Sequence, residues 1–101
     1  MKNTQQQVKD LEQIIFDKTG KTKEEAYFLL TNLSSEVGEL ADEIIGLEGE
    51  RIEDKTYKDK KAAAKEIVDV IMNAIRVANH YEIDLDEAWT QRLDGIKQKF
   101  S

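Results

Sequence analysis

Apolar residues recur at helical spacing in four segments of this chain. Between Thr4 and Lys18 they form one stripe, and Gly20 follows as the expected C-cap. A second segment opens at Thr22, which makes a capping box with Glu25. Its apolar residues then alternate four and three apart: Ala26, Leu30, Leu33, Val37, Leu40, Ile44 and Leu47. This sustained period predicts a long second helix of the kind found in helical bundles.

Residues 48–58 lose the period and predict a loop. A third helix is expected from about Asp59 to His80, and we expect it to bury Ala63, Ile67, Val70, Ile71, Ala74, Val77 and Ala78. A fourth starts after Asp84, an N-cap with Glu87 three residues on, and carries Ala88, Trp89, Leu93, Ile96 and Phe100. Strand-like alternation is missing from the sequence. The pattern predicts an all-α fold, a small four-helix bundle of antiparallel helices, as a single domain over residues 1–101.

Composition narrows the class of protein. The 101 residues include no proline, so no proline interrupts a helix. They include no cysteine, so disulfides and thiolate metal sites are excluded. No apolar run approaches the roughly 20 residues of a membrane span, and no secretory signal is recognisable at the N-terminus, so we expect a cytoplasmic protein without a membrane partner. The net charge of −6 argues against nucleic acid as a partner.

Four acidic residues are spaced as two matching pairs. Glu36 and Glu39 are three apart on the second predicted helix, and Glu66 and Asp69 repeat that spacing on the third. In an antiparallel hairpin both pairs lie about 10–16 Å from the turn. Carboxylates that face one another repel unless a hard cation divides them, which suggests Mg²⁺ or Mn²⁺, and Gly38 would let a ligand approach the backbone. The alternative is a solvated acidic face.

Two segments of the chain resemble a known family. Ser-Glu-Val-Gly-Glu-Leu-Ala-Asp-Glu at 35–43 and Glu-Ile-Val-Asp-Val-Ile at 66–71 are similar to the paired motif of the MazG-like, all-α nucleoside triphosphate pyrophosphohydrolases. That family's pattern is Glu-Glu-x-x-Glu, a variable gap, and Glu-x-x-Asp. Residues 78–88 resemble its usual turn and Ile-Asp-Leu continuation, so the likeness covers about residues 22–100.

The resemblance implies a function and its ligands. It implies Mg²⁺-dependent hydrolysis of a nucleoside triphosphate, a deoxynucleotide or a non-canonical nucleotide, to a monophosphate and pyrophosphate, in control of the nucleotide pool. Glu36, Glu39, Glu66 and Asp69 match the family's metal ligands, and Glu36 or Glu39 would also act as the general base. Ser35 stands where the family often has its first Glu, which leaves open which group activates the water.

Further residues are candidates for substrate binding and assembly. Asn73, one turn beyond Asp69, is expected to bond a phosphate or sugar oxygen, and Lys97 to contact the phosphates; ordinary surface positions are the alternative for both. Small bundles often pair to cover apolar surface, so we expect a homodimer or homotetramer.

Of three other classes of protein, the sequence excludes one and leaves two possible. A di-iron carboxylate bundle needs Glu-x-x-His on two helices, but the single histidine, His80, follows Val77 at that spacing. A phosphoribosyl-ATP pyrophosphohydrolase-like enzyme is possible within the same reaction type. From a different class, the chain could be a non-catalytic helical interaction module that pairs through the seam of its second helix.

Overall fold

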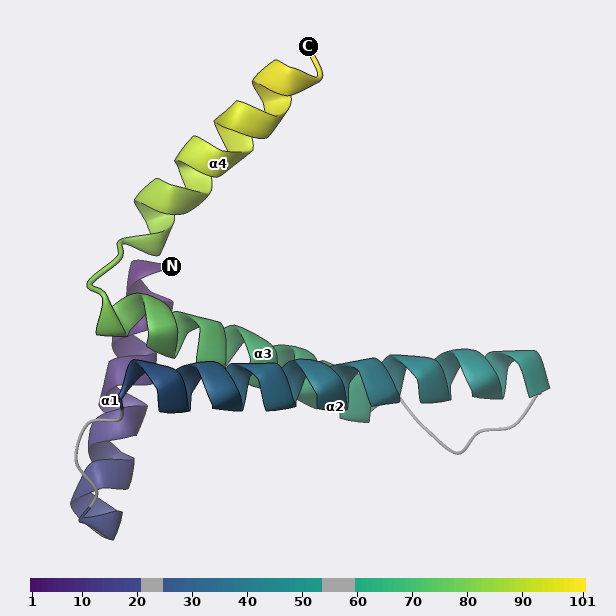
Figure 1. The fold of residues 1–101 in the computed structure, drawn as a ribbon, viewed down its shortest axis with the longest axis horizontal. Coiled ribbons are helices and arrows are strands. Elements are labelled where there is room, and N and C mark those ends of the chain that lie inside the picture. Colours follow the sequence, from purple (N-terminus) through teal and green to yellow (C-terminus); the bar gives the residue numbers. More distant parts are fainter. Residues whose placement is uncertain (21–24, 54–59) are drawn as a thin grey trace. The chain divides into compact units, whose positions relative to one another are not determined.

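The computed structural model describes residues 1–20, 25–53 and 60–101. These ranges hold four helices and no strand: α1 (Lys2–Thr19), α2 (Ala26–Glu53), α3 (Lys60–His80) and α4 (Leu85–Lys99), as Figure 1 shows. The predicted all-α class is therefore confirmed. None of the described helices combines the length and the apolar character that a membrane crossing requires.

The chain divides into two compact units. Unit 1 consists of Met1–Lys23 and Ile75–Ser101, and unit 2 consists of Glu24–Ala74. Unit 1 thus holds α1, the end of α3 and α4, whereas unit 2 holds α2 and most of α3. Because α3 is one continuous helix, it connects the two units through its backbone. The expected single domain over residues 1–101 stays a prediction.

Local capping chemistry sets two of the helix ends as predicted. Gly20 ends α1 with a left-handed backbone (φ 69°), and its N–H donates to the carbonyl of Phe16. That conformation suits glycine, which has no Cβ to clash. At the other end of the chain, the Asp84 carboxylate accepts from the backbone N–H groups of Asp86 and Glu87 and begins α4.

The second helix is longer than predicted. Residues 48–53 continue α2 to Glu53, so the predicted loop was wrong over this part. Glu48 and the charged residues after it are straight-chain residues with good helix propensity, so the helix continues although the apolar period of the sequence is lost there. The rest of that loop and the predicted cap at Thr22 lie outside the described residues.

The buried face of the helices also differs from the predicted one. Among the described residues, the buried apolar side chains are Val8, Leu29, Ala63, Ile75 and Ala78. On α2 the predicted Leu30, Val37 and Ile44 are exposed. On α3 Ala63 and Ala78 are buried as predicted, whereas the predicted Ile67, Ile71 and Ala74 are exposed. The less exposed stripe of α2 keeps the predicted Ala26, Leu33, Leu40 and Leu47, but Leu29, Glu36 and Glu43 lie between them in place of Leu30, Val37 and Ile44.

This difference has a simple geometric reason. The two stripes of α2 share four apolar residues and differ by one position at the three residues between them, so both satisfy a four-and-three alternation. Periodicity alone cannot choose between them. The stripe that is turned away from solvent includes two glutamates, Glu36 and Glu43, which a pattern of apolar residues does not record.

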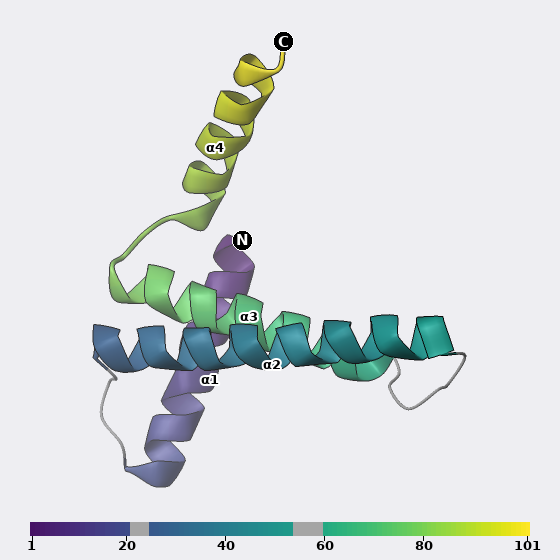
Figure 2. The ribbon, with the colours of Figure 1, turned by 45° about the vertical axis from the view of Figure 1, so that its right-hand side comes forward.

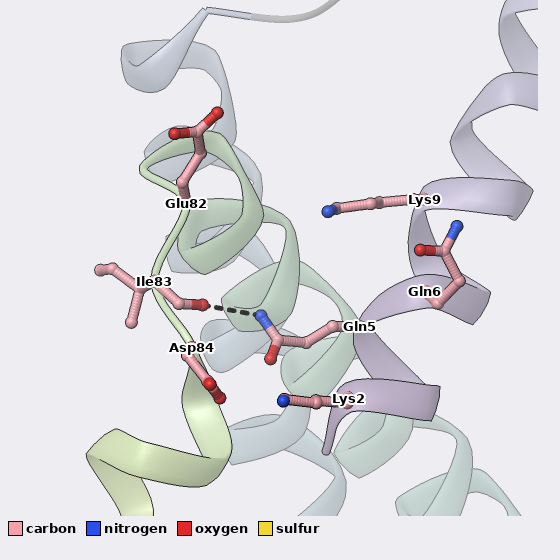
Figure 3. A pocket seen from close by; sticks show the side chains of 7 residues that line it. All are labelled: Lys2, Gln5, Gln6, Lys9, Glu82, Ile83 and Asp84. Carbon is pink, nitrogen blue, oxygen red and sulfur yellow. Dashed lines mark hydrogen bonds between the residues drawn. The ribbon is translucent and has the colours of Figure 1, made fainter.

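A glutamine side chain joins α1 to the turn between α3 and α4 inside unit 1. Gln5 is only 9% exposed; its Nε2 donates to Asn79 Oδ1 at 3.0 Å and to the carbonyl of Ile83 at 2.8 Å (Figure 3). Its Oε1 accepts from the backbone N–H of Leu85 at 3.1 Å. The amide therefore pairs with a side chain, a carbonyl and an N–H group of the turn and its flanks. It borders a cavity of about 340 Å³ lined by Lys2, Gln5, Gln6, Lys9, Glu82, Ile83 and Asp84.

Candidate functional site

The acidic residues predicted to form a site lie on the two helices of unit 2. Within this unit, α2 and α3 lie side by side and run in opposite directions in both views (Figures 1 and 2). Glu36 and Glu39 stand one turn apart on α2, and Glu66 stands on α3. Glu36 and Glu39 come close to Glu66, as predicted, although α2 extends six residues past Leu47, the helix end from which the equal spacing was counted.

Three of the four predicted carboxylates come together. A carboxylate oxygen of each of Glu36, Glu39 and Glu66 lies within 4.8 Å of the other two, and we call these three residues the carboxylate cluster. Glu36 and Glu66 are half-buried and Glu39 is exposed, so the cluster opens to solvent on the side of Glu39. The Oε2 atoms of Glu36 and Glu66 are buried and form no hydrogen bond within the described part of the chain.

The surroundings of Glu36 in the carboxylate cluster raise its pKa. Burial of the Glu36 carboxyl, and next the charge of Glu39, raise the pKa of Glu36 above its ordinary value of 4.5. Hydrogen bonds that its carboxyl makes with Glu66 and Glu39 raise this pKa further, as does the charge of Asp69. Like charges at this separation favour the protonated form of one partner. A bound cation would favour the ionised form instead.

The fourth predicted ligand, Asp69, is engaged by a lysine. The Asp69 Oδ2 atom lies 3.3 Å from the ammonium of Lys65, one turn earlier on α3, and Glu66 Oε1 lies 3.5 Å from the same ammonium. The hydrogen bond to Asp69 is the main reason that the pKa of Lys65 is raised. Asp69 is close enough to act on Glu36 through its charge, but it is not one of the three clustered carboxylates.

The two predicted substrate residues occupy different places. Asn73 lies one turn beyond Asp69 on α3, and its Nδ2 donates to the backbone carbonyl of Asp69 at 2.8 Å. That bond fixes the side chain next to the acidic residues. Lys97 is exposed on α4, in unit 1, whereas the carboxylate cluster belongs to unit 2. The proposed contacts of both residues with phosphate stay predictions.

Other residues near the cluster differ from what the sequence pattern suggested. Glu43, one heptad beyond Glu36 on α2, is half-buried with a buried Oε2 atom, and its seven-residue spacing from Glu36 was the available signal. Ser35 is exposed and adds no carboxylate. A Cβ built on Gly38 would meet no atom within 4 Å, so the described chain makes no close approach to that backbone.

Comparison with known proteins adds no relative. No family model, no curated protein and no solved structure matches this chain.

Proposed function

We propose that this protein hydrolyses a nucleoside triphosphate, either a deoxynucleotide or a non-canonical nucleotide, to the monophosphate and pyrophosphate with the help of Mg²⁺, and so controls the nucleotide pool. The observation that carries the proposal is the carboxylate cluster, formed across two antiparallel helices by Glu36, Glu39 and Glu66. The substrate class rests on the resemblance of residues 35–43 and 66–71 to the MazG-like motif.

The donor set fits a hard divalent cation. All three groups offer carboxylate oxygen, which Mg²⁺ and Mn²⁺ prefer over nitrogen or sulfur ligands. The buried Oε2 atoms of Glu36 and Glu66, which lack a hydrogen bond in the described chain, supply the kind of unsatisfied acceptor that a cation would satisfy. Asp69 would become a fourth ligand by exchanging its contact with Lys65.

The cation supplies two kinds of chemistry when bound: it neutralises triphosphate charge and lowers the pKa of a water. The protein's own residues hold and move the proton. Glu39, the exposed member of the cluster, is open to the attacking water and would accept its proton as the general base. The water oxygen bonds to the α-phosphorus, the bond from that phosphorus to the bridging oxygen breaks, and pyrophosphate leaves.

One observation favours a second candidate function. Leu30, Val37 and Ile44 repeat every seven residues on α2, and all three are exposed. Such a stripe suits a non-catalytic helical module that pairs with a partner helix. This candidate requires neither Mg²⁺ nor a nucleotide, so the two proposals differ in a measurable way.

The deciding experiment compares Glu39→Gln with Glu48→Gln. Both remove one charge from an exposed glutamate of α2, but only Glu39 belongs to the carboxylate cluster. We expect Glu39→Gln to lose metal-dependent pyrophosphate release by at least about 100-fold, the range for a general base, and Glu48→Gln to retain it. Equal activity of both variants would exclude the cluster as the catalytic site. A wild-type chain that binds no Mg²⁺ would favour the helical module.

A further inference from the structure

One lysine lies at the edge of the acidic residues of unit 2. The Lys65 ammonium is 3.5 Å from Glu66 Oε1 and 3.3 Å from Asp69 Oδ2, and all three residues belong to α3. Within residues 1–20, 25–53 and 60–101, no other cation forms an ion pair with the four acidic residues predicted to hold a metal. A ligand that arrives at the carboxylate cluster therefore meets this lysine.

The contact between Lys65 and Asp69 is easily exchanged. The two residues are one turn apart on one helix, and an exposed ion pair of this kind contributes little to stability, because water competes for both partners. The flexible four-carbon stem of a lysine lets the ammonium move while the helix stays in place. When Asp69 turns to a cation, as proposed above, the ammonium loses its nearest partner.

The balance of charge indicates which group would replace Asp69 as the partner of the ammonium. Four carboxylates lie around one ammonium, so the site stays negative after a single divalent cation binds, when all four are ionised. A triphosphate brings further negative charge to the same place, which the carboxylates repel. Lys65 is the described cation beside them that attracts it. A phosphate oxygen is thus the partner that the ammonium would gain.

We propose that Lys65 binds the phosphate chain of the nucleoside triphosphate, its ammonium moving from Asp69 to a phosphate oxygen when Asp69 turns to Mg²⁺. This inference rests on the proposed function, because it needs a cation at the carboxylate cluster. A lysine suits the task, since its compact charge carries three donors. The same charge repels Mg²⁺ and attracts the anion, so its removal should change the two affinities in opposite directions.

The test measures two affinities of the full chain by isothermal titration: that for Mg²⁺ alone, and that for inorganic pyrophosphate at saturating Mg²⁺. Pyrophosphate has no base, so it probes the phosphate site whichever nucleotide is the substrate. In Lys65→Met we expect Mg²⁺ to bind more tightly. We expect pyrophosphate to bind more weakly by about 10-fold or more, the loss of one hydrogen bond between charged groups.

Two variants are controls. Lys61→Met removes the same charge from an exposed residue one turn earlier on α3 and should leave both affinities unchanged. Lys65→Arg keeps the charge and should keep most of the affinity for pyrophosphate. The Lys65 side chain is 72% exposed, so these variants should fold, and circular dichroism checks their helix content.

The outcomes separate this proposal from the proposed function. A wild type that binds Mg²⁺ but no pyrophosphate, or a Lys65→Met variant with unchanged pyrophosphate affinity, overturns the role of Lys65 alone. A wild type that binds no Mg²⁺ overturns both. If Lys65→Met weakened Mg²⁺ and pyrophosphate equally, the lysine would hold the site together, and its role as a phosphate ligand would be overturned.

The dependence on salt is a second test. Added salt screens the attraction between an ammonium and a phosphate. Raising the NaCl concentration should therefore weaken pyrophosphate binding more steeply in the wild type than in Lys65→Met. The same steepness in both proteins would show that Lys65 does not contact the anion.

Discussion

Assembly of the carboxylate cluster destabilises the ionised form of Glu36. Its carboxyl is half-buried, it lies beside Glu39 and Glu66, and one of its oxygens is buried without a hydrogen bond in the described chain. The pKa of Glu36 is raised for this reason. Between the ordinary pKa of 4.5 and the raised value, the folded protein binds more protons at this site than the unfolded chain does, so folding stability decreases as the pH rises through this window.

We therefore expect Glu36→Gln to be more stable than the wild type in EDTA at neutral pH. The advantage should vanish as the pH falls below about 4.5, where Glu36 is protonated in both states. Urea titrations at a series of pH values, with and without Mg²⁺, measure the difference in unfolding free energy. Saturating Mg²⁺ should reverse the order by stabilising the wild type alone. A variant that is less stable than the wild type at every pH in EDTA would contradict this account.

Lys65 is the second residue whose role is electrostatic. Its ammonium contacts both Asp69 and Glu66, so it supplies positive charge where the cation would bind. Removing this charge by Lys65→Met should strengthen Mg²⁺ binding about 3- to 10-fold, since a unit charge about 4 Å away contributes on the order of 1 kcal/mol in water. Isothermal titration with Mg²⁺ measures the change. Lys61→Met, one turn earlier on α3, is the control, and weaker binding after Lys65→Met would show that the lysine instead holds the site together.

At the scale of an element, the side chain of Gln5 bonds α1 to the α3–α4 turn. The Gln5 side chain makes hydrogen bonds with Asn79, Ile83 and Leu85. The backbone carbonyl of Gln5 also accepts from Asn79 Nδ2 at 3.1 Å. The neighbouring Gln6 is exposed, and its Nε2 donates to Asp10 Oδ1, one turn later on α1, at 2.9 Å. Two adjacent glutamines thus have very different surroundings.

Gln5→Ala should lower the free energy of unfolding by about 1–3 kcal/mol, because it leaves buried polar groups of the turn without partners. Gln6→Ala should change it by less than about 0.5 kcal/mol, as is usual for a surface position. Thermal or urea denaturation of both variants measures the contrast. Similar losses in the two variants would mean that the Gln5 bonds contribute nothing specific.

The predictable and unpredictable features of the elements have different physical origins. Gly20 and Asp84 end and begin helices through chemistry local to a few residues, and the sequence shows both. The face of α2 depends on what packs against it, so the apolar pattern placed Leu30 inward where Leu29 is buried. The spacing of the acids anticipated that Glu36, Glu39 and Glu66 would meet. It missed the Lys65 contact of Asp69, because a neighbour on the same helix competes with the facing helix.

At the scale of the whole molecule, a cation held by residues of both α2 and α3 links binding to folding. Unfolding would separate Glu36 from Glu66, so under the proposed function Mg²⁺ would bind the folded chain alone. At a concentration 100 times its Kd, the ion should stabilise the protein by about 2.7 kcal/mol and raise Tm by several degrees. Differential scanning calorimetry measures the shift. An equal shift in a variant with Glu36, Glu39 and Glu66 all replaced by Gln would trace it to unspecific binding.

The central claim, catalysis by the carboxylate cluster, is tested most directly by pyrophosphate release. The full chain is incubated with each common ribo- and deoxynucleoside triphosphate, in Mg²⁺ and in EDTA, and both products are identified. We predict release of pyrophosphate with the matching monophosphate in Mg²⁺ only, its loss in Glu39→Gln, and a ranking of nucleotides that shows the preferred base. The claim would be contradicted if product formation persisted in EDTA or in Glu39→Gln. It would also be contradicted by a chain that binds no Mg²⁺ and releases no pyrophosphate.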